Sequence, residues 1–175
     1  MPDHSPVRIG VSACLLGRDC RYDGKHKRDS LLCDTLGQRF QCVPICPEVE
    51  LGLPTPRPAM QLQRRAGEIR LVVPEQEKDL TEAMLAYARR RVAALAEEGV
   101  CGFVLKSKSP SCGIWDVPVY EDAAAASQSG RGLFAETLMT RLPNLPVEDQ
   151  RRLQDARLRE NWIARVFAYA RNSAP

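Results

Sequence analysis

The sequence predicts an α/β domain with a mostly parallel central sheet flanked by helices. A helical pattern begins at Asp79, closes at Gly99 and leads directly into the apolar segment 100–105, which is typical of a strand. A strand, a helix and a strand joined by a tight glycine connection form the βαβ pattern, which implies parallel pairing. Two further short apolar segments, 7–11 and 40–45, each run out into a loop. Together these observations indicate a single Rossmann-like sheet.

The remaining elements follow from local patterns. Asp29 or Ser30 can cap a short helix that Gly37 terminates. Four prolines within 46–58 exclude a regular helix there and predict a rigid loop suited to binding. The other expected elements are a hairpin at 62–73, a capping box of Asp79 and Glu82, a flexible loop at 123–132, a helix at 132–142, a strand at 145–147 and a charged helix from 148. We therefore divide the chain into a main domain at 1–147 and a C-terminal helix and tail at 148–175.

Size and composition fit one globular domain. The chain has 175 residues, of which 44% are hydrophobic and 27% charged. A formal net charge of +3 is too mild for a dedicated nucleic-acid binder, so no macromolecular nucleic-acid partner is expected. The N-terminus lacks the basic start and apolar stretch of a secretory signal, and no apolar run is long enough to span a bilayer. We expect a cytoplasmic protein without a membrane partner.

Three of the seven cysteines lie where a short apolar strand ends. Cys14 follows the segment 7–11, Cys46 follows 40–45, and Cys112 lies in a loop after 100–105. Ligands of open parallel sheets bind beyond the carboxyl ends of the strands, so these thiols are expected to converge. Since disulfides are rare in a reducing compartment, such a cluster indicates metal binding or catalysis.

The other cysteines have weaker claims as ligands. Cys33, Cys42 and Cys101 adjoin apolar residues and are expected to be structural, whereas Cys20 is the one credible extra ligand. No Cys-x-x-Cys pair occurs, which argues against zinc ribbons and thioredoxin-type sites. Thiolates favour soft metals and iron–sulfur clusters, and three cysteines would leave one iron of a four-iron cluster open to substrate. A structural zinc site closed by Cys20 or His26 remains the alternative.

Motifs around these cysteines resemble those of a known family. Five occur in order: Ser-Ala-Cys-Leu-Leu-Gly at 12–17, Arg-Tyr-Asp-Gly at 21–24, Cys-Pro-Glu at 46–48, Gly-Leu-Pro-Thr-Pro-Arg at 52–57 and Ser-Pro-Ser-Cys-Gly at 109–113. Together they resemble the thiouracil desulfidase family, in a short form that lacks the C-terminal domain of longer relatives.

The resemblance implies a [4Fe-4S] cluster held by Cys14, Cys46 and Cys112. It also implies that sulfur is removed from a small thiolated pyrimidine, 2-thiouracil or a related base, with water supplying the replacing oxygen. Glu48 lies two residues past Cys46 and could activate water or move protons. Ser109 could hydrogen-bond the substrate, and we prefer it to Ser111 for this role.

Other polar residues are candidates for shaping the pocket, and each could equally be a surface or core residue. These are Asp23, Lys25, Arg28, Arg57, Lys106 and Lys108, with Tyr22 and Trp115 as possible stacking partners for a base. A second enzymatic alternative is an iron–sulfur enzyme of the tRNA-thiolation type. The sequence does not predict an oligomeric state.

Overall fold

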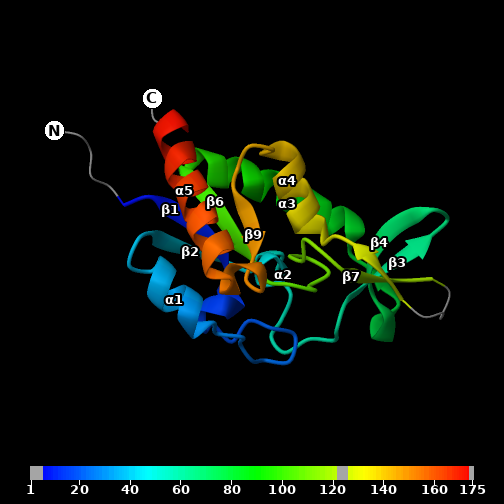
Figure 1. The fold of residues 1–175 in the computed structure, drawn as a ribbon. Coiled ribbons are helices and arrows are strands. Elements are labelled where there is room, and N and C mark those ends of the chain that lie inside the picture. The colour runs from blue at the N-terminus through cyan, green and yellow to red at the C-terminus, as the bar shows by residue number, and fades with distance from the viewer. Residues whose placement is uncertain (1–5, 122–125, 174–175) are drawn as a thin grey trace.

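The strands form two sheets rather than one (Figure 1). A computed structural model describes residues 6–121 and 126–173. Sheet A has the strand order β2-β1-β6-β9, and all its pairs are parallel. Its strands are β1 (Arg8–Ser12), β2 (Gln41–Ile45), β6 (Val100–Leu105) and β9 (Val147–Asp149). The α/β class with a parallel sheet is thus confirmed.

Sheet B is a second, mostly antiparallel sheet with the order β5-β4-β3-β7-β8. It contains β3 (Gln61–Arg65), β4 (Glu68–Val73), β5 (Lys78–Asp79), β7 (Val117–Tyr120) and β8 (Ser127–Gly130). The hairpin expected at 62–73 is confirmed as β3 and β4. The prediction of a loop at 123–132 is wrong for Ser127–Gly130, which pair with β7, while residues 122–125 lie outside the described part of the chain.

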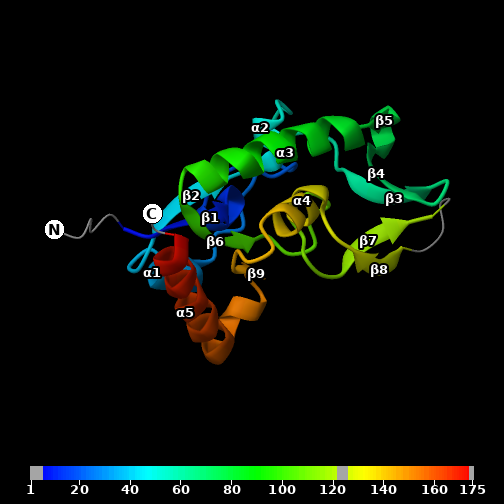
Figure 2. The ribbon, with the colours of Figure 1, turned by 90° about the horizontal axis from the view of Figure 1, so that it is seen from above.

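Helices cover both faces of sheet A, as Figure 2 shows. They are α1 (Ser30–Leu36), α2 (Pro47–Glu50), α3 (Thr81–Glu97), α4 (Leu133–Arg141) and α5 (Ala156–Ser173). Strand β6 is buried along its whole length, and its side chains alternate between the two sides. Phe103 packs into the core shared with α3 and α4, whereas Val104 packs into the core shared with α1 and α5. Burial on both faces explains why β6 is continuously apolar.

Two local predictions about helix starts are wrong. The proline-rich loop does contain a helical turn, α2, because Pro47 occupies its first position, where a missing N–H costs nothing. The capping box of α3 does not form, since the helix begins at Thr81 and Leu80 is its N-cap. Asp79 and Glu82 instead bind Arg70 of strand β4. Asp79 still accepts the Thr81 amide at 2.9 Å, but Glu82 pairs with the neighbouring strand, so the reciprocal capping box is not made.

The C-terminal part differs in its boundaries. The strand expected at 145–147 lies at Val147–Asp149, and the charged helix begins at Ala156 rather than at 148. Helix α5 packs into the core with Trp162 fully buried, its indole N–H donating to the carbonyl of Pro146 at 3.2 Å. Among residues 6–121 and 126–173, no helix combines the length and the hydropathy needed to cross a bilayer.

Candidate functional site

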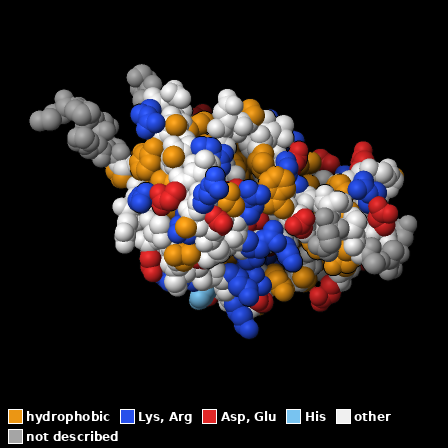
Figure 3. All heavy atoms as spheres, viewed as in Figure 1, with side chains coloured by type: hydrophobic (Ala, Val, Ile, Leu, Met, Phe, Trp, Pro, Cys, Tyr) orange, Lys and Arg blue, Asp and Glu red, His pale blue; other side chains and the backbone are white. Residues whose placement is uncertain are grey.

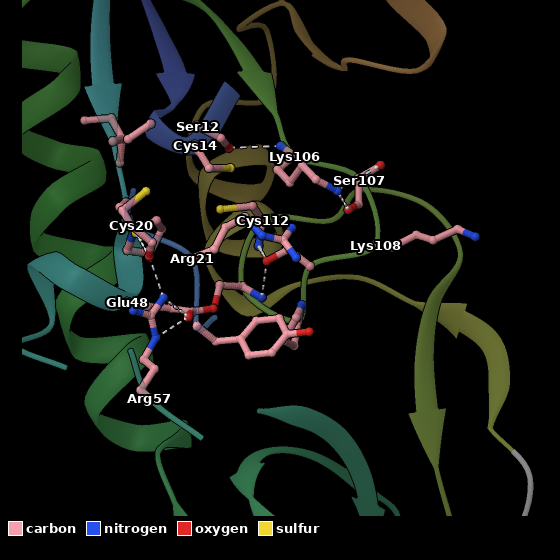
Figure 4. Close-up of a pocket in the computed structure, with 18 residues that line it drawn as sticks. Ser12, Cys14, Cys20, Arg21, Glu48, Arg57, Lys106, Ser107, Lys108 and Cys112 are labelled. Carbon is pink, nitrogen blue, oxygen red and sulfur yellow. Dashed lines mark hydrogen bonds and ion pairs between the residues drawn. The ribbon is translucent and has the colours of Figure 1, made fainter. Parts of the chain in front are cut away.

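A pocket of about 290 Å³ opens at the carboxyl edge of sheet A (Figure 4). Cys46 follows β2, Cys14 follows β1, and Cys112 lies in the loop after β6. Since these three strands are neighbours in the order β2-β1-β6, their ends bring the three cysteines to the same cavity. The structure therefore places the thiols where the strand pattern predicted them to converge.

Cys14 and Cys46 are held by turns that begin as each strand ends. Cys14 lies in a 3₁₀ turn, Ala13–Leu16, which Gly17 closes with a φ of 92°. Its carbonyl accepts the amide of Lys27 at 2.9 Å. Cys46 is the N-cap of helix α2. Both thiols thus project from backbone that is fixed by local hydrogen bonds.

The loop that carries Cys112 is shaped by Ser109. The Ser109 hydroxyl accepts the amides of Ser111 at 3.2 Å and of Cys112 at 3.0 Å, which closes a serine turn. Its own proton remains available for donation, because both of these contacts use the hydroxyl oxygen as an acceptor. Ser109 therefore combines the turn-forming role with a position on the pocket wall.

The same loop is clamped by the start of helix α4. The amides of Phe134 and Ala135 both donate to the Ser111 carbonyl, at 3.0 and 3.1 Å. A Cβ atom at Gly132 would lie only 2.4 Å from the carbonyl group of Ser111, so a glycine is required for this approach. Packing against α4 thereby fixes the position of the Cys112 loop relative to the sheet.

Cys20 is also in the pocket and links two of the other thiols. The Cys46 thiol donates to the Cys20 carbonyl at 3.8 Å, and the Cys20 thiol lies near those of Cys14 and Cys46, whose pKa values it shifts. The interaction with Cys20 lowers the pKa of Cys14, while the same interaction raises the pKa of Cys20 to about 11. For Cys46, the interaction with Cys20 and then burial raise the pKa. The sequence identified Cys20 only as an extra candidate ligand. The spacing of cysteines along the chain does not reveal contacts that form across the pocket.

The four remaining cysteines differ in their surroundings. Cys112 is buried, and desolvation raises its pKa strongly. Cys33, Cys42 and Cys101 do not line this pocket. The Cys101 thiol contacts the carbonyl of Gly99 at 3.3 Å, and burial raises its pKa. Of the seven thiols, four lie in the pocket and three are structural in their contacts.

Glu48 lies on the pocket wall within a buried network. Its Oε2 accepts two hydrogen bonds from Arg57, from Nε at 2.8 Å and from Nη2 at 2.5 Å. Its Oε1 accepts the hydroxyl of Ser111 at 3.0 Å. Ser111, not Ser109, is therefore the serine in contact with this carboxylate. Sequence patterns named Arg57 only as one of several pocket candidates and could not reveal the pairing.

Cationic and aromatic side chains form the rim. Arg21, Tyr22, Lys106 and Lys108 line the pocket, and Figure 3 shows Lys and Arg side chains gathered on the lower middle of this face. Burial lowers the pKa of Lys106, and neighbouring cations lower it further. The amide of Lys106 also donates to the Ser12 hydroxyl at 2.9 Å, which ties the ends of β6 and β1 together. This rim favours an anionic or electron-rich ligand.

Other residues named from the sequence lie outside the pocket. Asp23 instead holds its own loop, bonding Arg21 and the amide of Lys25. Trp115 is 42% exposed and lies beneath the guanidinium groups of Arg131 and Arg152. Lys25 and Arg28 are likewise absent from the pocket lining. Of the two proposed stacking partners, only Tyr22 faces the cavity.

The donor set of the pocket consists mainly of thiols. Within residues 6–121 and 126–173, no three His, Cys, Asp or Glu side chains are grouped closely enough to hold a single metal ion. His26 does not line the pocket, and its Nδ1 accepts the amide of Arg28. The zinc alternative therefore loses its histidine ligand. Free thiols on separate strand ends match the ligands that iron–sulfur clusters use.

Comparisons with known proteins agree with this description. A family model described as 2-thiouracil desulfurase matches residues 9–150. The uncharacterized protein YbbK of Bacillus subtilis (strain 168) is 33% identical over 110 residues, covering 60% of this chain and 72% of YbbK. A solved structure described as the [4Fe-4S]-dependent thiouracil desulfidase TudS is 34% identical, with a TM-score of 0.70. The match covers 89% of this chain and 98% of that one.

Proposed function

The chain belongs to the 2-thiouracil desulfurase family, and we propose that it hydrolyses 2-thiouracil or a related thiolated base to uracil and hydrogen sulfide. The observation that carries this proposal is the meeting of Cys14, Cys46, Cys112 and Glu48 in one pocket. Three thiols supply metal ligands, and the carboxylate supplies a proton acceptor beside them. The structural similarity to a [4Fe-4S]-dependent desulfidase supports the same assignment.

We propose that Cys14, Cys46 and Cys112 hold a [4Fe-4S] cluster. Their thiols are soft donors that project from three neighbouring strand ends, and none is consumed in a disulfide. Such a group supplies a Lewis-acidic iron with a free position when only three cysteines ligate it. Cys20 then serves as a neighbour of the ligands, with its carbonyl accepting the Cys46 thiol, rather than as a ligand itself.

Different residues of the pocket would transfer protons, hydrogen-bond the base and stabilise negative charge. Glu48 would take one proton from the water that attacks the carbon bearing sulfur and give it to the departing sulfur, and the second water proton leaves the new hydroxyl as the C=O bond forms, so that sulfur departs as hydrogen sulfide. Ser109 donates its hydroxyl proton to a polar edge of the base. Lys106 and Arg21 at the rim stabilise negative charge that develops on the leaving sulfur. One water is consumed for each sulfide released, and no net electron transfer is required.

The substrate we propose is a small molecule. The cavity of about 290 Å³ would have to hold both the cluster and the substrate, which favours a single base over a larger ligand. Tyr22 lines this cavity and is available for stacking. A reducing cytoplasm remains part of the proposal, because the cysteines must stay as thiols to bind iron.

Sulfide release by protein reconstituted without oxygen tests the function. Protein with about four irons per chain should convert 2-thiouracil to equal amounts of uracil and sulfide. Glu48→Gln should lower kcat by about 10²- to 10⁴-fold while iron content stays constant. Thiolated RNA, offered in parallel, should release little sulfide if the substrate is a free base.

Two further results would count against the proposal. Iron-loaded protein that releases no sulfide from any thiolated base would contradict the reaction. Loss of iron in Cys20→Ala would contradict the three-cysteine ligand set, since Cys20 would then be needed to hold the cluster. The zinc alternative would be supported by one tightly bound zinc per chain.

A further inference from the structure

Arg57 is a buried cation whose hydrogen-bonding capacity is fully used. Its side chain is only 4% exposed. Besides its two bonds to Glu48, Nη1 donates to the Pro54 carbonyl at 3.2 Å and to the Thr55 hydroxyl at 3.1 Å. Nη2 also donates to the Cys20 carbonyl at 2.9 Å. All five N–H groups of the guanidinium therefore have partners, which fixes its plane and its position.

The contacts leave one side of Glu48 free for chemistry. Each carboxylate oxygen offers about two acceptor positions. Both positions of Oε2 are taken by Arg57, and one position of Oε1 is taken by Ser111, whose residue is 1% exposed. The remaining position of Oε1 is the only one these contacts leave open. Figure 4 shows the carboxylate between Arg57 and the Cys112 loop, with the pocket beside it.

We propose that Arg57 is a positioning residue that orients Glu48 so that Oε1 alone exchanges the proton with water or substrate. This inference rests on the proposed function, in which Glu48 is the proton acceptor. The planar fork of arginine grips one carboxylate oxygen with two N–H groups, whereas a lysine ammonium is a single mobile point charge. Arginine at position 57 thus sets the rotation of the carboxylate as well as its charge environment.

Stabilisation of the fold does not by itself explain the buried ion pair between Arg57 and Glu48. Removing two charges from water costs about as much as their attraction returns, so a buried ion pair contributes little net stability. Orientation is a stronger reason, because a reacting group displaced by about 1 Å can lose about 10² in rate. Arg57 is bound to both the Cys20 loop and the 54–57 loop, so it transmits the position of rigid backbone to Glu48.

Arg57→Lys, measured on iron-loaded protein, tests the proposal. We expect kcat for sulfide release to fall by about tenfold to a hundredfold, with KM changed by less than about threefold. Iron content per chain and the thermal midpoint serve as readouts independent of activity, and both should stay near wild-type values. The matched control is Arg91→Lys, which alters an arginine that pairs with Glu50 on the same helix, α2. This control should leave kcat unchanged.

A double-mutant cycle decides whether Arg57 acts through Glu48. In a Glu48→Gln background, Arg57→Lys should cost less than about twofold, because the carboxylate it orients is gone. In addition, guanidinium ion should partly restore kcat to Arg57→Ala, whereas methylammonium should not. Rescue of this kind reports geometry at the carboxylate, which a merely structural role would not produce.

Each opposing result has a separate meaning. Full additivity of the two substitutions, or loss of iron in Arg57→Lys, would show that Arg57 only ties the loops together and would overturn the proposal. An unchanged kcat in Arg57→Lys would overturn it as well. If iron-loaded wild-type protein released no sulfide, the proposed function would fail and this inference with it.

Discussion

Polar side chains are buried at the carboxyl edge of sheet A but exposed on sheet B. At the edge of sheet A, Ser12, Ser111 and Arg57 are buried, at 3%, 1% and 9% exposure. On sheet B, Arg64 pairs with Glu121 on the surface, where both are about half exposed. Buried polar groups are costly unless they are fully hydrogen-bonded, whereas surface pairs cost and contribute little. The difference indicates that polar groups at the edge of sheet A are held in fixed positions, whereas those on the surface of sheet B are not.

The largest expected effect comes from removing a pocket thiol. Cys112→Ala should reduce iron from about four per chain to below one and abolish sulfide release, because no other pocket cysteine projects from the β6 loop. Iron analysis and visible absorption after anaerobic reconstitution measure this change. The thermal midpoint should change only slightly, since the substitution deletes a single buried sulfur atom.

Cys101→Ala is the matched control for that variant. Cys101 is also buried and lies on β6, but its thiol contacts the Gly99 carbonyl away from the pocket. Iron content and activity should remain at wild-type values. Equal iron loss in both variants would mean that the two regions do not differ as described, and that any buried thiol on this strand affects the cluster.

A substitution in sheet B should have the reverse profile. Leu71 on β4 is fully buried in the core shared with α3, so Leu71→Ala should lower the free energy of unfolding by about 2–5 kcal/mol. The kcat per bound iron should change by less than about twofold, because Leu71 does not line the pocket. Urea unfolding and sulfide release measure the two quantities. A large fall in kcat at full iron content would contradict the separation of sheet B from the site.

Strand-end positions were predictable from the sequence, and the network between them was not. Apolar runs ending at Cys14 and Cys46, together with a βαβ pattern, suffice to place thiols at one edge of a parallel sheet. Sheet B required pairing between segments far apart in the chain, as in β3 with β7, which local patterns do not report. In the same way, Cys20 and Arg57 make their contact only when the loop that carries Cys20 packs against the loop that carries Arg57.

The expected capping box failed for a related reason. Asp79 followed by Glu82 satisfies the local rule for a helix start, but Arg70 on the adjacent strand attracts both carboxylates. Local propensity is a weak prior that tertiary contacts override. The motifs around the cysteines were more informative than the helix rules, because several separated motifs must occur together.

The smallest expected effect is a pH dependence at this Arg70–Asp79 pair. Desolvation alone would raise the pKa of Asp79, but hydrogen bonds from Arg70 and Thr81 outweigh it and lower the pKa to about 2, from its ordinary value of 3.8. A depressed carboxyl pKa contributes stability above the unfolded-state value, and this contribution is lost as pH falls from about 4 to about 2. Because the pair is partly exposed, the contribution should be only about 0.2–1 kcal/mol.

Asp79→Asn isolates that contribution. Urea unfolding followed by far-ultraviolet circular dichroism should show the variant slightly less stable than wild type at pH 7. The difference should shrink between pH 4 and pH 2, because wild-type Asp79 then becomes protonated and loses its charge attraction to Arg70. Loss of bound iron in acid affects both proteins alike and cancels in the difference. A difference that stays constant down to pH 2 would contradict a contribution from the ionised form of Asp79.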